Sequence, residues 1–255
     1  MAFPDKASVV ARLQESPLYP AAFRELFGED IFTDVDAAYA AMTESIAAYE
    51  RGEFFSPFDS KYDRYLRGEY EMTREEELGM TLFFSEQFTN CNQCHQLNNL
   101  PGAQREVFSD YTFHNIGVPV NSALRQANGL GVEYKDKGLL ENPHVTDPAQ
   151  AGKFKVPTLR NVAITAPYMH NGVFQDLKTV VQFYNKYNSR NEAAQINPET
   201  GEYWGEPEIA ENISLTELEI GPFLDERRVD ALVAFMRLLT DRRYEALLET
   251  QHQTP

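Results

Sequence analysis

Apolar residues recur at helical spacing in several parts of the chain. A first stripe contains Val9, Val10 and Leu13 and stops at Pro17. A longer stripe begins after Thr33 and Asp34, either of which could cap a helix with its side-chain oxygen. Its members are Val35, Ala38, Tyr39, Met42, Ile46 and Tyr49. The spacing predicts helices over both stripes.

A third helix is predicted ahead of the two cysteines. Thr73 and Glu76 form a capping-box pattern, in which each side chain accepts from the backbone of the other. The apolar positions that follow predict a helix that leads into Cys91; they are Leu78, Met80, Leu82, Phe83 and Phe84. Helical spacing returns over Leu177, Val180, Val181 and Tyr184, and again over Val229, Leu232, Val233 and Met236.

The remaining segments predict loops. Glycine and proline punctuate residues 96–160, which indicates loops with short helical or extended pieces. Residues 188–215 are mostly polar and predict an excursion over the surface. The expected fold class is therefore mostly α, with long structured loops.

Composition limits the functions that the chain can have. The chain has 255 residues and a formal net charge of −16. Phosphate neutralisation needs clustered basic residues, so nucleic acid is not an expected partner. The acidity favours a small basic partner protein, although it could also serve only to keep the protein soluble. No apolar run approaches the ~18 residues that a membrane-spanning helix needs, and the opening residues do not resemble a signal peptide.

The candidate chemistry lies at residues 91–95, which read Cys-Asn-Gln-Cys-His. Two thiols separated by two residues can each add to a vinyl group of one haem, and the next residue, His95, can then bind the iron. The motif therefore predicts one covalent haem c on Cys91 and Cys94, with His95 as the proximal iron ligand. Such haem is attached outside the bacterial cytoplasm, which predicts a periplasmic protein whose signal peptide is not in this chain.

Three other interpretations of the two cysteines are weaker. A zinc site would need two further ligands at usable spacing, which the sequence does not offer. A thioredoxin-like redox pair would need a βαβ context, and the neighbouring pattern is helical. Two buried thiols without a function are the remaining alternative.

The second axial ligand of the iron must come from another part of the chain. Methionine, histidine and tyrosine could each fill this position. The candidates are Met80, His114, Met169, His170, Tyr184 and Met236. Side-chain chemistry alone does not choose among them, and core packing is the simplest interpretation of those at helical spacing.

The chain resembles the bacterial di-haem cytochrome c peroxidases and the related methylamine-utilisation di-haem enzymes. The resemblance extends over nearly the whole chain but matches only the C-terminal half of such a protein. The matching stretches are VVARLQESPLYPAAFRELFG, YDRYLRGEYEMTREEELGMTLFF, FHNIGVP, KFKVPTLRNVAITAPYMHNG, LKTVVQFYN and LDERRVDALVAFMRLLTD.

The resemblance implies roles for particular residues. Counted from Thr165 in the TAPY segment, Tyr184 occupies the position of the family's distal haem ligand, and tyrosine there is typical of the methylamine-utilisation branch. Met169 is the alternative distal ligand. A calcium site would use the carbonyl groups of Thr165 and Pro167.

Two further residues match family positions. His170 corresponds to a histidine near the domain interface of the family, although a hydrogen-bonded buried histidine is an equal alternative. Arg160 is expected to bind a haem propionate, with a surface ion pair as the alternative.

The resemblance also implies a domain and a function. Residues 1–255 would form the C-terminal electron-transfer domain, with a class I cytochrome c-like fold, of a cytochrome c peroxidase-like oxidoreductase. The N-terminal domain with the peroxide-reducing haem would be absent, and Met1 would directly follow the family's acid–base glutamate. Electrons would come from a small basic cytochrome or copper protein, and a homodimer is possible.

The alternatives to this function belong to other classes. One is a stand-alone monohaem electron carrier without peroxidase activity. The other is a non-haem metal or interaction module.

Overall fold

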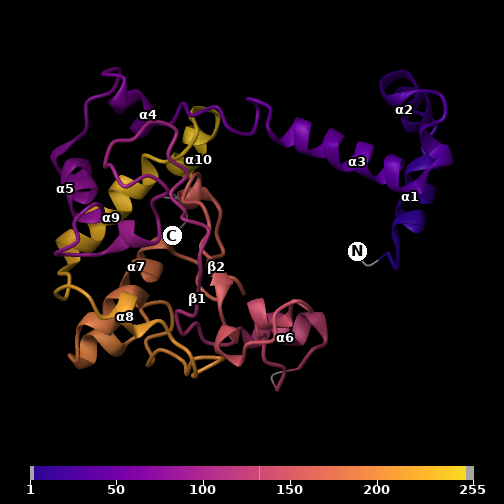
Figure 1. Cartoon of the computed structure of the whole chain (residues 1–255). Coiled ribbons are helices and arrows are strands. Elements are labelled where there is room, and N and C mark those ends of the chain that lie inside the picture. The colour runs from indigo at the N-terminus through magenta and orange to yellow at the C-terminus, as the bar shows by residue number, and fades with distance from the viewer. Residues whose placement is uncertain (1–2, 132, 251–255) are drawn as a thin grey trace. The chain divides into compact units, whose positions relative to one another are not determined.

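The computed structural model describes residues 3–131 and 133–250. The chain forms two compact units, over residues 1–57 and 58–255 (Figure 1). The sequence pattern was interpreted as one domain and does not mark this boundary. Met1, which was expected to follow a missing glutamate, lies outside the described residues.

The first unit consists of α1 (Lys6–Gln14), α2 (Tyr19–Phe27) and α3 (Val35–Glu50). The helices predicted over the first two apolar stripes are confirmed. Asp34 caps α3, because its side chain accepts from the backbone amides of Asp36 and Ala37. The pattern missed α2, whose Pro20 lies in the first helical turn, where proline is tolerated.

Part of the apolar stripe of α3 faces outward. Ala38 and Ala41 are buried, whereas the side chains of Ile46 and Tyr49 are 49% and 67% exposed. Helical spacing therefore predicted the helix correctly, but it did not predict which of its residues are buried within this unit.

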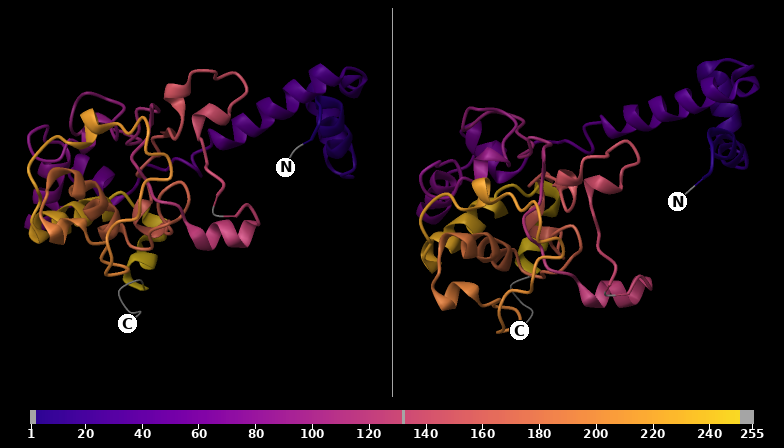
Figure 2. Two further views of the ribbon diagram at one scale, coloured as in Figure 1. Left: turned by 90° about the horizontal axis from the view of Figure 1, so that it is seen from below. Right: turned by 60° about the horizontal axis from the view of Figure 1, so that its bottom comes forward.

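The second unit is built around α5 (Arg74–Phe83) and α9 (Glu226–Arg237), with α7 (Leu177–Asn185) on the other side of α9 (Figures 1 and 2). The predicted capping box of Thr73 and Glu76 is present at the start of α5. Gly79 lets α5 approach α9 closely, since a Cβ atom there would lie 1.8 Å from the carbonyl oxygen of Ala231. The predicted helices over 177–184 and 229–236 are confirmed.

Two apolar clusters share α9. The first is rich in aromatic residues from α4 (Lys61–Leu66), α5, α9 and the loop before β1, among them Tyr62, Phe83, Phe108 and Phe235. The second contains Phe174, Phe183 and Met236. Val162 and Val181 pack against both clusters. Burial on both sides of α9 therefore joins α5 and α7 into one unit.

Loops and short elements complete this unit, as predicted. The short elements are α4 (Lys61–Leu66), α6 (Ser122–Asn128), α8 (Leu215–Leu218) and α10 (Glu245–Thr250), with β1 (Phe113–His114) antiparallel to β2 (Phe154–Lys155). The prediction that 188–215 only crosses the surface was partly wrong, because Glu208 and Ile209 are buried. The described residues are thus mostly helical, and none of their helices is long and apolar enough to cross a membrane.

The close approach at Gly79 can be tested by adding one methyl group. We expect Gly79→Ala to lower the free energy of unfolding by about 3 kcal/mol, because the new Cβ would overlap backbone atoms of α9. Urea unfolding followed by circular dichroism measures the change, with Glu77→Ala on the exposed face of α5 as the control. Equal stability of the two variants would show that the helices do not meet at this point.

Candidate functional site

The segment that carries the two cysteines is not a continuation of α5. The helix ends at Phe83, and Cys91–Gln93 form a short 3-10 turn instead. The prediction that the helix leads into Cys91 was therefore wrong. Asn90, just before the turn, has a φ of 59°, a left-handed conformation that asparagine tolerates better than most residues. This turn redirects the chain so that Cys91 packs against the first apolar cluster.

Both cysteine side chains are half-buried, and they do not form a disulfide with each other. Burial raises the pKa of Cys91, and it raises the pKa of Cys94 to about 11. The 3-10 turn is closed by the amide of His95, which donates to the carbonyl of Cys91 at 2.9 Å. The two sulfurs are therefore neutral and held on a short, defined turn.

The imidazole of His95 is oriented by the backbone. Its Nδ1 lies 3.1 Å from the carbonyl oxygen of Phe108. A carbonyl can only accept, so Nδ1 carries the proton and Nε2 keeps its lone pair. Burial also lowers the pKa of His95, which favours the neutral ring. A neutral imidazole with a free Nε2 is the form that binds a metal.

Tyr184, near the end of α7, is a neighbour of the two thiols. Burial raises the pKa of its phenol, and charge on Cys94 or Cys91 would raise it further. The next residue, Asn185, fixes this end of the helix by two hydrogen bonds of 2.9 Å with the backbone of Leu224. Cys91, Cys94 and His95 thus lie on one turn, and Tyr184 lies near enough to the two sulfurs for their charge to act on its phenol.

The other candidates for the distal ligand have different surroundings. His114 lies beside Cys94, with Nε2 at 3.7 Å from the sulfur, and its ring also contacts Thr112 and Ser214. The methionines take part in core packing: Met80 in the first apolar cluster, and Met169 and Met236 in the second.

His170 and the predicted calcium ligands lie in other surroundings. The ring of His170 stacks on Phe154 at 3.6 Å, and its Nε2 lies 4.0 Å from Glu208. Thr165 and Pro167 are exposed. Within the described ranges, no three His, Cys, Asp or Glu side chains are arranged to hold a metal ion.

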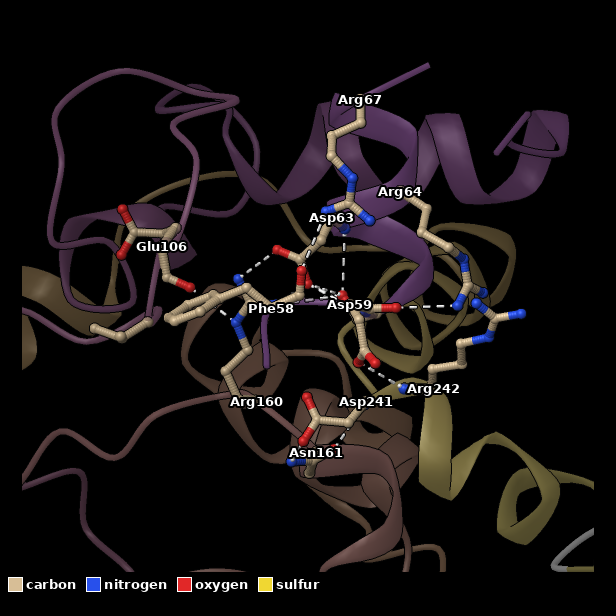
Figure 3. Close-up of polar contacts among 12 residues, drawn as sticks. Phe58, Asp59, Asp63, Arg64, Arg67, Glu106, Arg160, Asn161, Asp241 and Arg242 are labelled. Atoms are coloured by element: carbon tan, nitrogen blue, oxygen red, sulfur yellow. Dashed lines mark hydrogen bonds and ion pairs between the residues drawn. The ribbon is translucent and has the colours of Figure 1, made fainter. Parts of the chain in front are cut away.

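Arg160 is held by protein groups (Figure 3). Its Nη1 and Nη2 donate to the two carboxylate oxygens of Asp63 at 2.6 and 3.0 Å. Nη1 also donates to Ser60, and Nε donates to the backbone carbonyl of Glu106 at 2.8 Å. The side chains of the ion pair are only 11% and 4% exposed. Of the five N–H donors of a guanidinium, four are used here, so one is left for the predicted propionate contact.

Sequence reasoning missed Asp63 and Glu106. The Ser-x-x-Asp spacing of Ser60 and Asp63 is a capping-box pattern and could have predicted the start of α4, where the box is present. It could not have predicted the pairing with Arg160, which is remote in sequence. Glu106 stands alone in a loop, and no local pattern marks it as buried.

This set of donors fits a covalently attached haem. Two neutral thiols on one turn are available for the thioether bonds, and a neutral imidazole that donates through Nδ1 keeps its lone pair on Nε2. A phenol near the sulfurs comes from a different helix. The donor chemistry of these residues therefore fits the site of a c-type cytochrome.

Comparison with known proteins gives the family. The family model for di-haem cytochrome c peroxidases matches residues 1–71. The chain is 55% identical to the methylamine utilization protein MauG of Paracoccus denitrificans, over 98% of this chain and 64% of that protein. It is 33% identical to the cytochrome-c peroxidase IdrP1 of Denitromonas iodatirespirans, over 71% of this chain and 49% of that protein.

A solved structure agrees with this relationship. The diheme peroxidase BthA of Burkholderia thailandensis superposes with a TM-score of 0.74 at 27% identity, covering 96% of this chain and 61% of that one. The chain thus spans less than two thirds of the length of these relatives. The chain belongs to the di-haem cytochrome c peroxidase family, a family of oxidoreductases.

The buried ion pair provides a test of how the site is supported. We expect Asp63→Asn to lower the free energy of unfolding by about 3 kcal/mol, because it leaves the guanidinium of Arg160 buried without its counter-charge. Urea unfolding measures this change. The matched control is Asp230→Asn, which weakens a partly exposed pair with Lys178 and should cost less than about 1 kcal/mol. Equal losses would mean that the Asp63 pair does not stabilise the site.

Proposed function

We propose that residues 58–255 form a class I cytochrome c-like electron-transfer domain of a di-haem peroxidase-like oxidoreductase. The observation that carries this proposal is the grouping of Cys91, Cys94 and His95 with Tyr184, which comes from a helix far along the chain. Family membership supports it, because the family is named for di-haem cytochrome c peroxidases.

Each residue of the group has a role in this proposal. Cys91 and Cys94 would form the thioether bonds, His95 would bind the iron as the proximal ligand and Tyr184 would be the distal ligand. Haem c, when bound, supplies one-electron redox chemistry at its iron. The hydrogen bond from Nδ1 of His95 to Phe108 keeps the ring in the tautomer that ligation requires.

Two protein ligands on the iron would favour electron transfer over reaction with peroxide. With His95 and Tyr184 both bound, no position is left for peroxide to coordinate. The chain has two cysteines and therefore one CxxCH motif, so this motif can attach one haem c. In our proposal this domain passes electrons to a separate peroxide-reducing haem, which this motif does not provide.

The same proposal includes the electron donor, the cellular compartment and a calcium ion. A net charge of −16 favours a small basic cytochrome or copper protein as the electron donor. Haem c attachment implies the periplasm. We propose a calcium ion bound by the backbone carbonyls of Thr165 and Pro167. For the haem iron, Met169 is the alternative distal ligand to Tyr184. The expected contact of Arg160 with a propionate, the interface role of His170 and a homodimer stay predictions.

The rate of hydrogen peroxide consumption distinguishes two hypotheses. In one, this chain only transfers electrons; in the other, it reduces peroxide by itself. The chain, matured together with haem-attachment proteins, should accept electrons from a basic cytochrome but consume little hydrogen peroxide. Raising the ionic strength should slow its reduction, since screening weakens attraction between opposite charges. Rapid peroxide consumption by this chain alone would contradict the proposal.

The same reduction experiment addresses the second candidate function. A stand-alone electron carrier, which the single CxxCH motif would allow, would be reduced by the donor and would return its electrons to any small acceptor. Our proposal expects electrons to pass selectively to a peroxide-reducing haem domain of the family when that domain is added.

Replacement of the phenol tests the distal ligand. We expect Tyr184→Phe to open the sixth coordination position, which changes the ferric absorption and electron paramagnetic resonance spectra from low spin to high spin. Tyr187→Phe is a matched control, because Tyr187 is close in sequence but donates to the carbonyl of Ile116 instead. An unchanged spectrum in Tyr184→Phe would point to another ligand, Met169 first.

A further inference from the structure

We propose that Glu106 is the positioning residue of the proximal histidine: its buried carboxylate holds the loop that presents the Phe108 carbonyl to His95. The effect on the haem iron rests on the proposed function. The effect on the tautomer of His95 does not, because it concerns only groups that the structure describes.

The carboxylate of Glu106 is buried, and all of its hydrogen bonds that the structure shows are to N–H groups. The residue is 2% exposed. Its Oε1 accepts from the amides of Leu97 and Phe108 at 2.8 and 3.0 Å. Its Oε2 accepts from the amide and the side chain of Asn98 at 3.0 and 3.1 Å. One side chain therefore joins the residues just after His95 to the residue whose carbonyl His95 contacts.

The loop that this carboxylate closes has an unfavourable backbone conformation. Arg105 and Phe108 flank Glu106 and have φ values of 59° and 57°, in the left-handed region. Such a conformation costs roughly 1–2 kcal/mol at a residue other than glycine. It persists only where other interactions hold it. The four hydrogen bonds of Glu106, together with the burial of the Phe108 ring, supply those interactions.

The hydrogen bond to the amide of Phe108 is one of the restraints on the residue whose carbonyl faces His95. The nitrogen of this residue is held by Glu106, and its ring is packed edge-on against Tyr62 and Phe83. These two contacts hold the Cα of Phe108, and the buried Ser109, whose hydroxyl donates to the carbonyl of Val156 at 2.7 Å, holds the other side of the peptide group whose oxygen faces Nδ1 of His95. Loss of the carboxylate would release one of these restraints.

Glu106 also adds a negative charge to the loop that contacts His95, besides the charge of Asp110, which acts on His95 directly. Its carboxylate is bonded to neutral N–H groups, and the neighbouring cation, Arg160, pairs with Asp63 and reaches only the backbone carbonyl of Glu106. The charge of the carboxylate is therefore not cancelled by a direct ion pair. A fixed negative charge close to a haem iron favours the ferric state and lowers its reduction potential.

Glu106→Gln tests the proposal with little change of shape. A glutamine NH₂ group cannot accept, so two of the four hydrogen bonds are lost whichever way the amide lies. The matched control is Glu75→Gln, which removes the same charge from an exposed position in α5. The whole 255-residue chain, matured with haem-attachment proteins, is used for wild type and both variants.

Three measurements are made on the same material. Nitrogen-15 NMR of the histidine side chains gives the tautomer of His95 and the rate at which its Nδ1 proton exchanges with water. The haem content and reduction potential are measured by absorption during a redox titration. Thermal unfolding shows whether each variant is folded.

The proposal predicts a selective change in Glu106→Gln. The Nδ1 proton of His95 should exchange about tenfold faster or more, and the reduction potential should rise. Glu75→Gln should match the wild type. If Glu106→Gln lowers only the unfolding temperature and leaves the exchange rate and the potential unchanged, the residue is merely structural and the proposal is wrong.

The failure of the proposed function would look different. A chain without haem would contradict that function, yet the exchange rate of the Nδ1 proton would still be measurable in the same sample. Faster exchange in Glu106→Gln would then support the positioning role by itself, and unchanged exchange would overturn it.

Discussion

The hydrogen bond from His95 to the carbonyl of Phe108 is the interaction on which the site depends. Phe108 joins the site to the fold, because its ring is fully buried in the aromatic cluster between α5 and α9 while its carbonyl accepts from the imidazole. The packing of α5 against α9 therefore helps to orient Nδ1 of His95. Core stability and the ligand geometry of the site are consequently linked.

Two polar side chains extend this link without touching the imidazole. Glu106 closes the loop that contains Phe108, and Arg160 bonds to the backbone of Glu106 while it pairs with Asp63. Buried charges of this kind are retained only when they are well paired or bonded. Here that requirement ties α4, the loop before β1 and the segment after β2 to one another around the histidine.

The sequence predicted the parts of this arrangement that depend on local spacing. The Cys-x-x-Cys-His motif, the capping box of Thr73 and the helix that contains Tyr184 each involve residues close together in the chain. The contacts of Glu106 and the pairing of Asp63 with Arg160 could not be predicted, because they depend on the path of loops in the tertiary fold and not on local sequence spacing. The end of α5 at Phe83 was missed for a different reason. The apolar pattern continues through Phe84, although the helix ends one residue earlier.

The account depends most directly on a haem bound through both sulfurs of one turn. Mass spectrometry of the matured chain after proteolysis measures this bond. The account predicts that the peptide containing Cys91 and Cys94 carries the mass of one haem and that neither sulfur can be alkylated. Two alkylated sulfurs and no added tetrapyrrole in correctly matured protein would contradict it.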